Sequence, residues 1–182
     1  MSLLIVIGVI ALLIIWIISV QRRFVSQDEL CKNALSQIGV QQSSRWDALT
    51  ALVELTKSYD EHEYNTLKDV ISQRIKIGAN STAAEAQAQE NALESTLSKI
   101  IAVAEQYPDL KASEMYAKTM ESVNLYENQV RQSRMVYNDT VTKYNRMVRQ
   151  FPDSIVAGLL HFTEREYLEE PKGKTDMPSM KI

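Results

Sequence analysis

Residues 3–20 have the sequence LLIVIGVIALLIIWIISV, and Gln21-Arg22-Arg23 follows directly. The run from Leu3 to Val20 contains no charged side chain. A helix rises about 1.5 Å per residue, so these residues would span ~27 Å, close to the hydrocarbon thickness of a bilayer. A helix also satisfies its own backbone hydrogen bonds, as a segment in lipid must. Residues 1–23 are therefore predicted to form a transmembrane anchor.

A cleaved secretory signal peptide is the alternative interpretation of this run. Such a peptide carries a positive region before its apolar stretch and a small-residue cleavage site after it. Met1-Ser2 provides no positive side chain, and Ser19-Val20-Gln21 is a poor cleavage site. A retained, single-pass anchor is the better interpretation.

The basic residues near the anchor lie on one side of it. Arg22 and Arg23 follow the apolar run, and Lys32 comes soon after. The positive-inside rule places such residues in the cytoplasm. We therefore expect the N-terminus outside and the rest of the chain inside.

The composition of the chain indicates an all-α protein. Its 182 residues include five glycines and four prolines, and no stretch alternates β-branched with polar residues. Residues 24–167 are long enough for one domain with its own core. The net charge is −3, and Arg22-Arg23 is the only basic block, so nucleic acid is not an expected partner.

Proline and glycine divide the domain into predicted helices. The first continues from the anchor to about Tyr59, and the second covers about 61–77. The third runs from a Thr82/Glu85 capping box to residue 107. The fourth runs from a Ser113 or Asp109 cap to about 151. The apolar stripes of these helices have the 3.5-residue period of coiled coils. Short loops favour antiparallel neighbours, so we predict an up-down-up-down four-helix bundle. Residues 168–182 contain two prolines and one glycine and are expected to form a mobile tail.

Polar residues interrupt the apolar stripes. The inner stripe of the fourth helix contains Glu127 and Arg134, and Asn138 flanks it. The first helix loses its stripe around Gln42 and Arg45. We expect these five residues to form a polar layer, with Arg45 pairing with Glu127. A layer that fixes helix register is favoured over a ligand-binding cluster.

Catalytic signals are weak, and we predict no catalytic, cofactor-binding or metal-ligating residues. His62-Glu63 is not a zinc-protease motif, because Thr66 stands where the second histidine would be. Cys31 has no obvious base beside it. The sequence therefore predicts a protein that is not an enzyme.

Unequal helix lengths predict an exposed surface near the membrane. The fourth predicted helix has about 40 residues, or ~60 Å, and the second is less than half as long. Long helices that overhang short ones leave apolar residues uncovered, which predicts a homo-oligomer interface at Phe24, Val25, Leu30 and Cys31. In the alternative, residues 155–167 fold back over the overhang and the protein is a monomer.

Several motifs resemble the LemA family. Residues 34–45 are similar to the helix that follows its membrane anchor, and residues 107–114 to the turn before its fourth helix. Other matches are Glu127-Asn128, Arg134, Tyr137-Asn138, Tyr144-Asn145, Phe151-Pro152 and Val156-Ala157. The resemblance implies a helical bundle anchored in a bacterial cell membrane. It implies no settled activity: some members are linked to organelle membrane shaping in magnetotactic bacteria, and others to envelope stress or signalling.

Two classes of function follow. The first is a membrane-anchored scaffold or interaction protein that contacts lipid, self-associates and organises or shapes the membrane, with a signalling or envelope-stress accessory as its variant. The second is a ligand-binding protein or enzyme that uses Arg45, Glu127 and Arg134.

Overall fold

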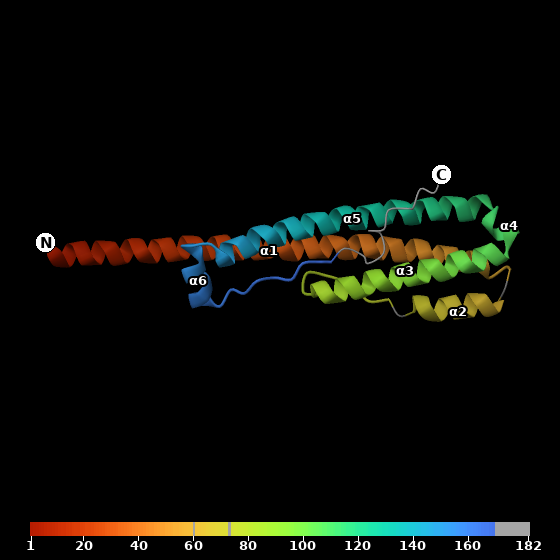
Figure 1. Ribbon diagram of the computed structural model, residues 1–182, viewed down its shortest axis with the longest axis horizontal. Coiled ribbons are helices and arrows are strands. Elements are labelled where there is room, and N and C mark those ends of the chain that lie inside the picture. Colours follow the sequence, from red (N-terminus) through yellow and green to blue (C-terminus); the bar gives the residue numbers. More distant parts are fainter. Residues whose placement is uncertain (60, 73, 170–182) are drawn as a thin grey trace, which may run out of the picture.

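The computed structural model describes residues 1–59, 61–72 and 74–169 (Figure 1). Every regular element within these residues is a helix, which confirms the all-α prediction. The helices are α1 (Ser2–Thr56), α2 (Glu61–Ile71), α3 (Ala83–Gln106), α4 (Pro108–Lys111), α5 (Glu114–Arg149) and α6 (Asp153–Leu160).

Helix α1 is a single helix of 55 residues, about 82 Å long. Its apolar N-terminal part is exposed and projects beyond the other helices (Figure 1). This part is long and apolar enough to cross a membrane. From Val20 onward the same helix contributes buried residues to the core. The membrane candidate and the core of the domain are thus one continuous element.

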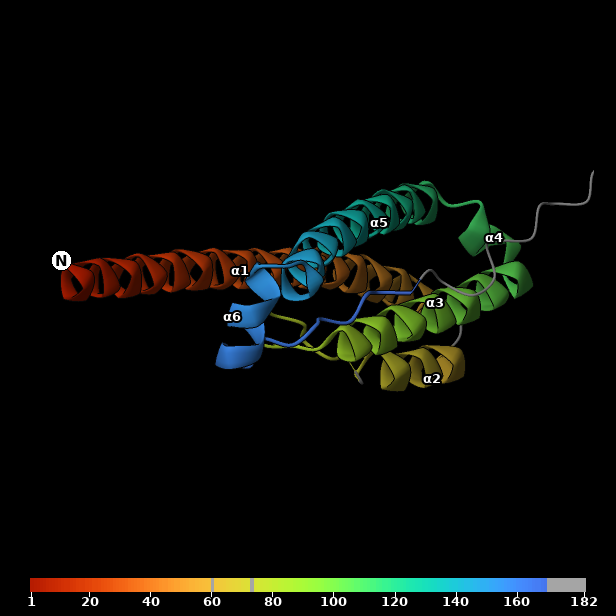
Figure 2. The same cartoon turned by 60° about the vertical axis from the view of Figure 1, so that its left-hand side comes forward.

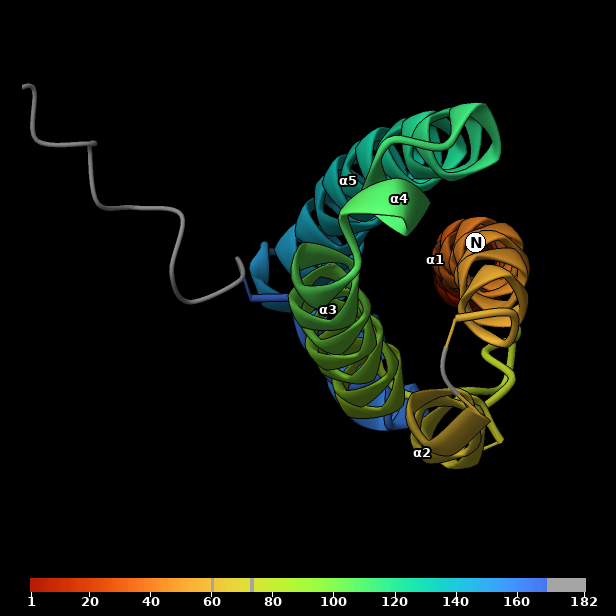
Figure 3. The same ribbon diagram turned by 90° about the vertical axis from the view of Figure 1, so that its right-hand side faces the viewer.

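Helix α5 lies alongside α1 and runs in the opposite direction. Arg23 pairs with Asp153, just beyond α5, and Arg45 pairs with Glu127 within it, so residue numbers fall along one helix as they rise along the other. Helix α1 also packs against α2 and α3. The end-on view shows α5, α3 and α2 arranged around one side of α1 (Figure 3). A closed four-helix bundle with up-down-up-down topology stays a prediction.

Two side-chain signals fix the starts of the longer helices. Thr82 and Glu85 form the predicted capping box of α3. Ser113 accepts a hydrogen bond from the Tyr116 backbone and caps α5, which leaves Pro108–Lys111 as a separate turn, α4. Such caps satisfy backbone N–H groups that have no partner within the helix.

Helix α2 ends at Ile71 rather than near residue 77. The chain then crosses α1 at Gly39, where a Cβ atom would clash with the backbone carbonyl of Ile77. The backbone N–H of Ile75 donates to Gln89 Oε1 of α3 at 3.1 Å. Gly39 therefore permits a close approach, and the crossing segment is held by a side chain distant in sequence.

The half of the core nearer the apolar run is covered by residues that follow α5. Helix α3 reaches this half only with its first turn, through Ala83 and Ala86. The rest is covered by α6 and the extended residues 162–169, here called the strap (Figure 1). Phe162 stacks on Phe24 with a centroid distance of 4.7 Å. Phe24 and Cys31 are both 0% exposed, so the expectation that nothing covers them is wrong. Val25 and Leu30 remain 41% and 48% exposed.

The strap also changes the account of the predicted C-terminal tail. Leu168 is buried, and the backbone carbonyl of Glu169 accepts a hydrogen bond from Arg134. The first two residues of the predicted 168–182 tail are therefore packed against the domain. Residues 170–182 lie outside the described part of the chain.

Candidate functional site

A charged layer divides the core into two apolar halves. Arg45 of α1 is 1% exposed and donates to Glu90 Oε1 at 2.5 Å and to Glu127 Oε2 at 3.2 Å. Gln42 donates to Glu90 Oε2 at 3.0 Å and to the backbone carbonyl of Ala86 at 3.0 Å. The predicted Arg45–Glu127 contact is confirmed. The layer links α1 to both α3 and α5.

Glu90 is the strongest partner of Arg45, and sequence reasoning did not place it in the layer. It is only 4% exposed and lies on the apolar stripe of α3. That position was the available signal, since a carboxylate on an inner stripe needs a partner. Glu127 is partly exposed and is shared with Arg131 at 3.6 Å.

The layer borders a surface groove of about 390 Å³. The groove lies between α1 and the segment that crosses it, and it is lined by Gly39, Val40, Gln42, Ser43, Ser44 and residues 74–77. Gln42 Oε1 is buried and has no hydrogen-bond partner among the described residues. Arg74 pairs with Asp47 at 2.8 Å and also bonds Ser43. Arg74, which lines the groove, is thus already engaged by Asp47 and Ser43.

A second polar set lies on α5 and holds the strap. Asn145 donates to the carbonyl of Arg165 at 2.9 Å and accepts from its N–H at 2.8 Å. Asn138 makes the same pair of bonds to Leu168, at 2.9 and 3.0 Å. Each amide side chain therefore pairs with one strap residue as a neighbouring β-strand would.

The spacing of the two asparagines matches an extended peptide. Seven residues of helix rise about 10.5 Å, and three residues of extended chain cover about 10 Å. Asn138 and Asn145 are seven residues apart, whereas Arg165 and Leu168 are three apart. The heptad repeat that suggested a coiled-coil seam here positions side chains along a strap running antiparallel to α5.

Arg134 and Asn138 were expected in the polar layer, and the structure places both against the strap. Arg134 donates to Gln87 of α3 at 2.8 Å and to the backbone carbonyl of Glu169. The hydroxyl of Tyr137 donates to the backbone carbonyl of Glu166 at 3.0 Å. The five predicted layer residues therefore belong to two neighbouring sets.

A salt bridge ties the strap to α1. Arg165 donates to Asp28 Oδ1 through Nε at 2.9 Å and Nη2 at 2.5 Å, and Lys32 lies 2.9 Å from Oδ2. Burial would raise the pKa of Asp28, but hydrogen bonds from Lys32 and Arg165 outweigh it and lower this pKa. Burial raises the pKa of the nearby Cys31 thiol. Cys31 is thus a packed thiol held in its neutral form.

The predicted anchor residues differ in their surroundings. Leu3 and Arg22 are exposed, whereas Val20 is buried in the core that contains Val156 and Ala157 of α6. Arg23 pairs with Asp153 at 3.0 Å. The end of the apolar run is therefore already in contact with the domain. No group of three or more His, Cys, Asp or Glu residues suited to a metal ion occurs within the described residues.

A model of the LemA family matches residues 34–181, most of the chain. The chain belongs to the LemA family. Magnetosome proteins MamQ 1 and MamQ 2 of Paramagnetospirillum magneticum are each 31% identical to it over 80 residues. The matched residues are 43% of this chain and 29% of each relative, so the match covers less than a third of the relatives' length. The family resemblance of the fourth helix now has a structural counterpart: Arg134, Tyr137, Asn138 and Asn145 bind the strap.

Proposed function

We propose that this LemA-family protein is a non-catalytic, single-pass membrane scaffold. Helix α1 crosses a bacterial membrane, and the domain lies on the cytoplasmic face, where it self-associates or binds other proteins. The carrying observation is the continuity of α1 from Ser2 to Thr56. Because one helix holds both the exposed apolar run and the core, the domain has a fixed direction relative to the bilayer. The similarity to two magnetosome proteins supports membrane association.

Self-association is proposed to use the outer stripe of α1. With Phe24 and Cys31 buried, five of the exposed residues of this helix recur at steps of four and three, the spacing of a coiled-coil seam. They are Ser26, Leu30, Asn33, Gln37 and Val40. Leu30 and Val40 supply exposed apolar side chains. The residues between them are polar, so the contact between one pair of copies is weak.

The mass of the full-length chain in nanodiscs tests self-association. We expect an oligomer that falls to a monomer when Leu30→Arg and Val40→Arg are combined. Leu125→Arg is the matched control, because Leu125 is an exposed leucine on α5 outside the proposed stripe. A monomer at every protein-to-lipid ratio would remove self-association from the proposal.

Thiol labelling in intact cells tests the orientation. A Lys118→Cys variant in a Cys31→Ala background carries one thiol, at an exposed position on α5. A membrane-impermeant maleimide should label it only after the membrane is broken. Labelling in sealed cells would place the domain on the other side.

Ligand binding in the groove beside the polar layer is the second candidate. Its lining includes Ser43, Ser44, Arg74 and Lys76, which suits a small anion, and its volume is in the range of ligand sites. Citrate and inorganic phosphate are suitable probes in a thermal-shift assay. Stabilisation that is lost in Arg74→Ala would favour this function, and no shift with either probe would count against it.

A further inference from the structure

Helix α6 is a short helix with apolar residues on more than one side. Its sequence is DSIVAGLL, and Val156 and Ala157 face the core. Ile155 and Leu159, one turn apart, are 56% and 63% exposed, and Phe151 just before the helix is also exposed. Residues 155–160 of this helix carry no polar side chain, and a helical segment that is apolar all round belongs in a protein interior or in lipid. The outer side of α6 therefore needs a partner.

The position of α6 along α1 indicates which partner. Val20, the last residue of the apolar run, lies in the same core as Val156 and Ala157. Arg23 pairs with Asp153 at the first turn of α6. Both views show α6 lying across α1 rather than along it, near the end of α5 (Figures 1 and 2). Helix α6 thus marks the level at which α1 changes from apolar to basic.

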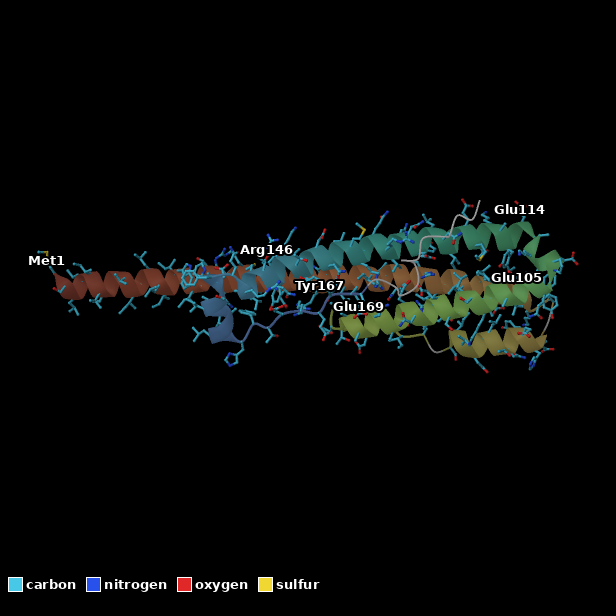
Figure 4. All side chains as sticks on the ribbon, in the orientation of Figure 1. Met1, Glu105, Glu114, Arg146, Tyr167 and Glu169 are labelled. Carbon is cyan, nitrogen blue, oxygen red and sulfur yellow. The ribbon has the colours of Figure 1, made fainter. Side chains whose placement is uncertain are left out.

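Basic side chains surround this level. Arg146 and Arg149 are exposed at the end of α5 and, with Thr142 and Gln150, line a hollow of about 350 Å³. Figure 4 shows Arg146 at the membrane-proximal end of α5, opposite Glu114 at the far end. The acidic neighbour Glu164 pairs with Arg149 at 3.7 Å. Exposed arginines beside an apolar helix face are typical of proteins that lie on anionic lipid.

We propose that α6 is an interfacial helix that inserts Ile155 and Leu159 into the leaflet from which the domain emerges, with the arginines of α5 at the lipid phosphates. This inference rests on the proposed membrane anchor and adds a second attachment to it. A single transmembrane helix leaves a domain free to rotate about the helix axis. A second lipid contact removes that freedom and presents a fixed face of the domain along the membrane.

Spin labels on the full-length chain in phosphatidylethanolamine–phosphatidylglycerol vesicles test the inference. Single labels replace Leu159 (Leu159→Cys), Leu12 within the anchor (Leu12→Cys) and Leu125 on α5 (Leu125→Cys), each in a Cys31→Ala background. All three leucines are exposed, so the labels do not displace core residues. Collisions with oxygen report lipid, and collisions with a soluble nickel chelate report water. We expect oxygen to dominate at Leu12 and Leu159 and nickel to dominate at Leu125.

The outcomes separate the two proposals. If the Leu12 label collides mainly with oxygen and the Leu159 label mainly with the nickel chelate, the interfacial helix is overturned and the anchor is left intact. Nickel dominance at Leu12 overturns the anchor and the interfacial helix together. A Leu159 label protected from both reagents lies in a protein contact, such as one with a second copy, and also overturns the lipid assignment. An Ile155→Cys label should repeat the Leu159 result.

Discussion

Replacing Arg45 with methionine should destabilise the domain strongly, because it leaves a buried carboxylate without its cation. Glu90 is only 4% exposed, and one of its oxygens accepts from Arg45 at 2.5 Å. After the substitution, the neutral amide of Gln42 remains as a donor, at 3.0 Å from the other oxygen. Removing one partner of a buried pair costs about 3–5 kcal/mol. A domain of this size loses roughly 2–4 °C in Tm per kcal/mol, so we expect a fall of about 10 °C.

The double variant Arg45→Met with Glu90→Leu distinguishes a stranded charge from lost packing. Replacing both members of a buried pair with apolar residues is often neutral or stabilising. Glu127 loses Arg45 as well, but it is partly exposed and keeps Arg131 at 3.6 Å. We therefore expect the double variant to be more stable than Arg45→Met alone.

Thermal unfolding of the detergent-solubilised full chain, followed by far-UV circular dichroism at neutral pH, measures both effects. Arg131→Met is the matched control, because Arg131 pairs with the same Glu127 but is exposed. Its effect should stay within about 0.5 kcal/mol, as for other surface positions. An Arg45→Met effect of that size, or a double variant no more stable than the single one, would refute the reasoning.

Three further substitutions test other contacts. Gly39→Ala forces the 74–77 segment away from α1 and should lower Tm by the equivalent of about 1–3 kcal/mol. Gly158→Ala is the control, because its new methyl group meets open space. An unchanged Tm for Gly39→Ala would contradict the close crossing. Asn145→Ala removes two hydrogen bonds to the strap, which should lower the free energy of unfolding by about 1–3 kcal/mol. It should also speed proteolysis of the strap, and an unchanged digestion pattern would show that these two bonds are dispensable. The pKa of Asp28 is lower in the folded chain than in the unfolded chain, where it is about 3.9. The ionised carboxylate therefore contributes to the free energy of unfolding above this unfolded pKa, and that contribution is lost as the pH falls through the folded pKa. The Tm advantage of the unsubstituted chain over Asp28→Asn should therefore narrow below about pH 4, and a constant gap would contradict this.

Local signals in the sequence predicted much of the fold. The apolar run and the scarcity of proline predicted one long first helix, and α1 is continuous from Ser2 to Thr56. The Thr82 capping box correctly placed the start of α3, and Ser113, one of the two predicted caps of the fourth helix, is the N-cap of α5. These features depend on residues within a few positions of each other, which is why sequence patterns alone could find them.

The strap and the end of α2 depend on contacts between distant residues. Asn145 bonds a residue 20 positions away, and Asn138 bonds one 30 positions away. Helical periodicity shows which face of α5 is special, but it does not distinguish a helix from an extended peptide as the occupant of that face. For the same reason Arg134 and Asn138 were assigned to the interior layer.

The need to satisfy backbone groups explains why α5 has so many polar residues on its inner side. An extended segment outside a sheet has N–H and C=O groups without partners, and burying them unpaired is costly. Helix α5 supplies those partners through Asn138, Asn145 and Tyr137. Arg134 stands where the cover of the core changes, since it reaches Gln87 near the start of α3 and Glu169 at the end of the strap. The α1–α5 pair is thus covered by helices α2 and α3 far from the anchor and by the strap and α6 near it. At this junction, side chains of α1 and α5 bond both covering segments: Gln42 donates to the Ala86 carbonyl of α3, and Arg134 donates to the Glu169 carbonyl of the strap.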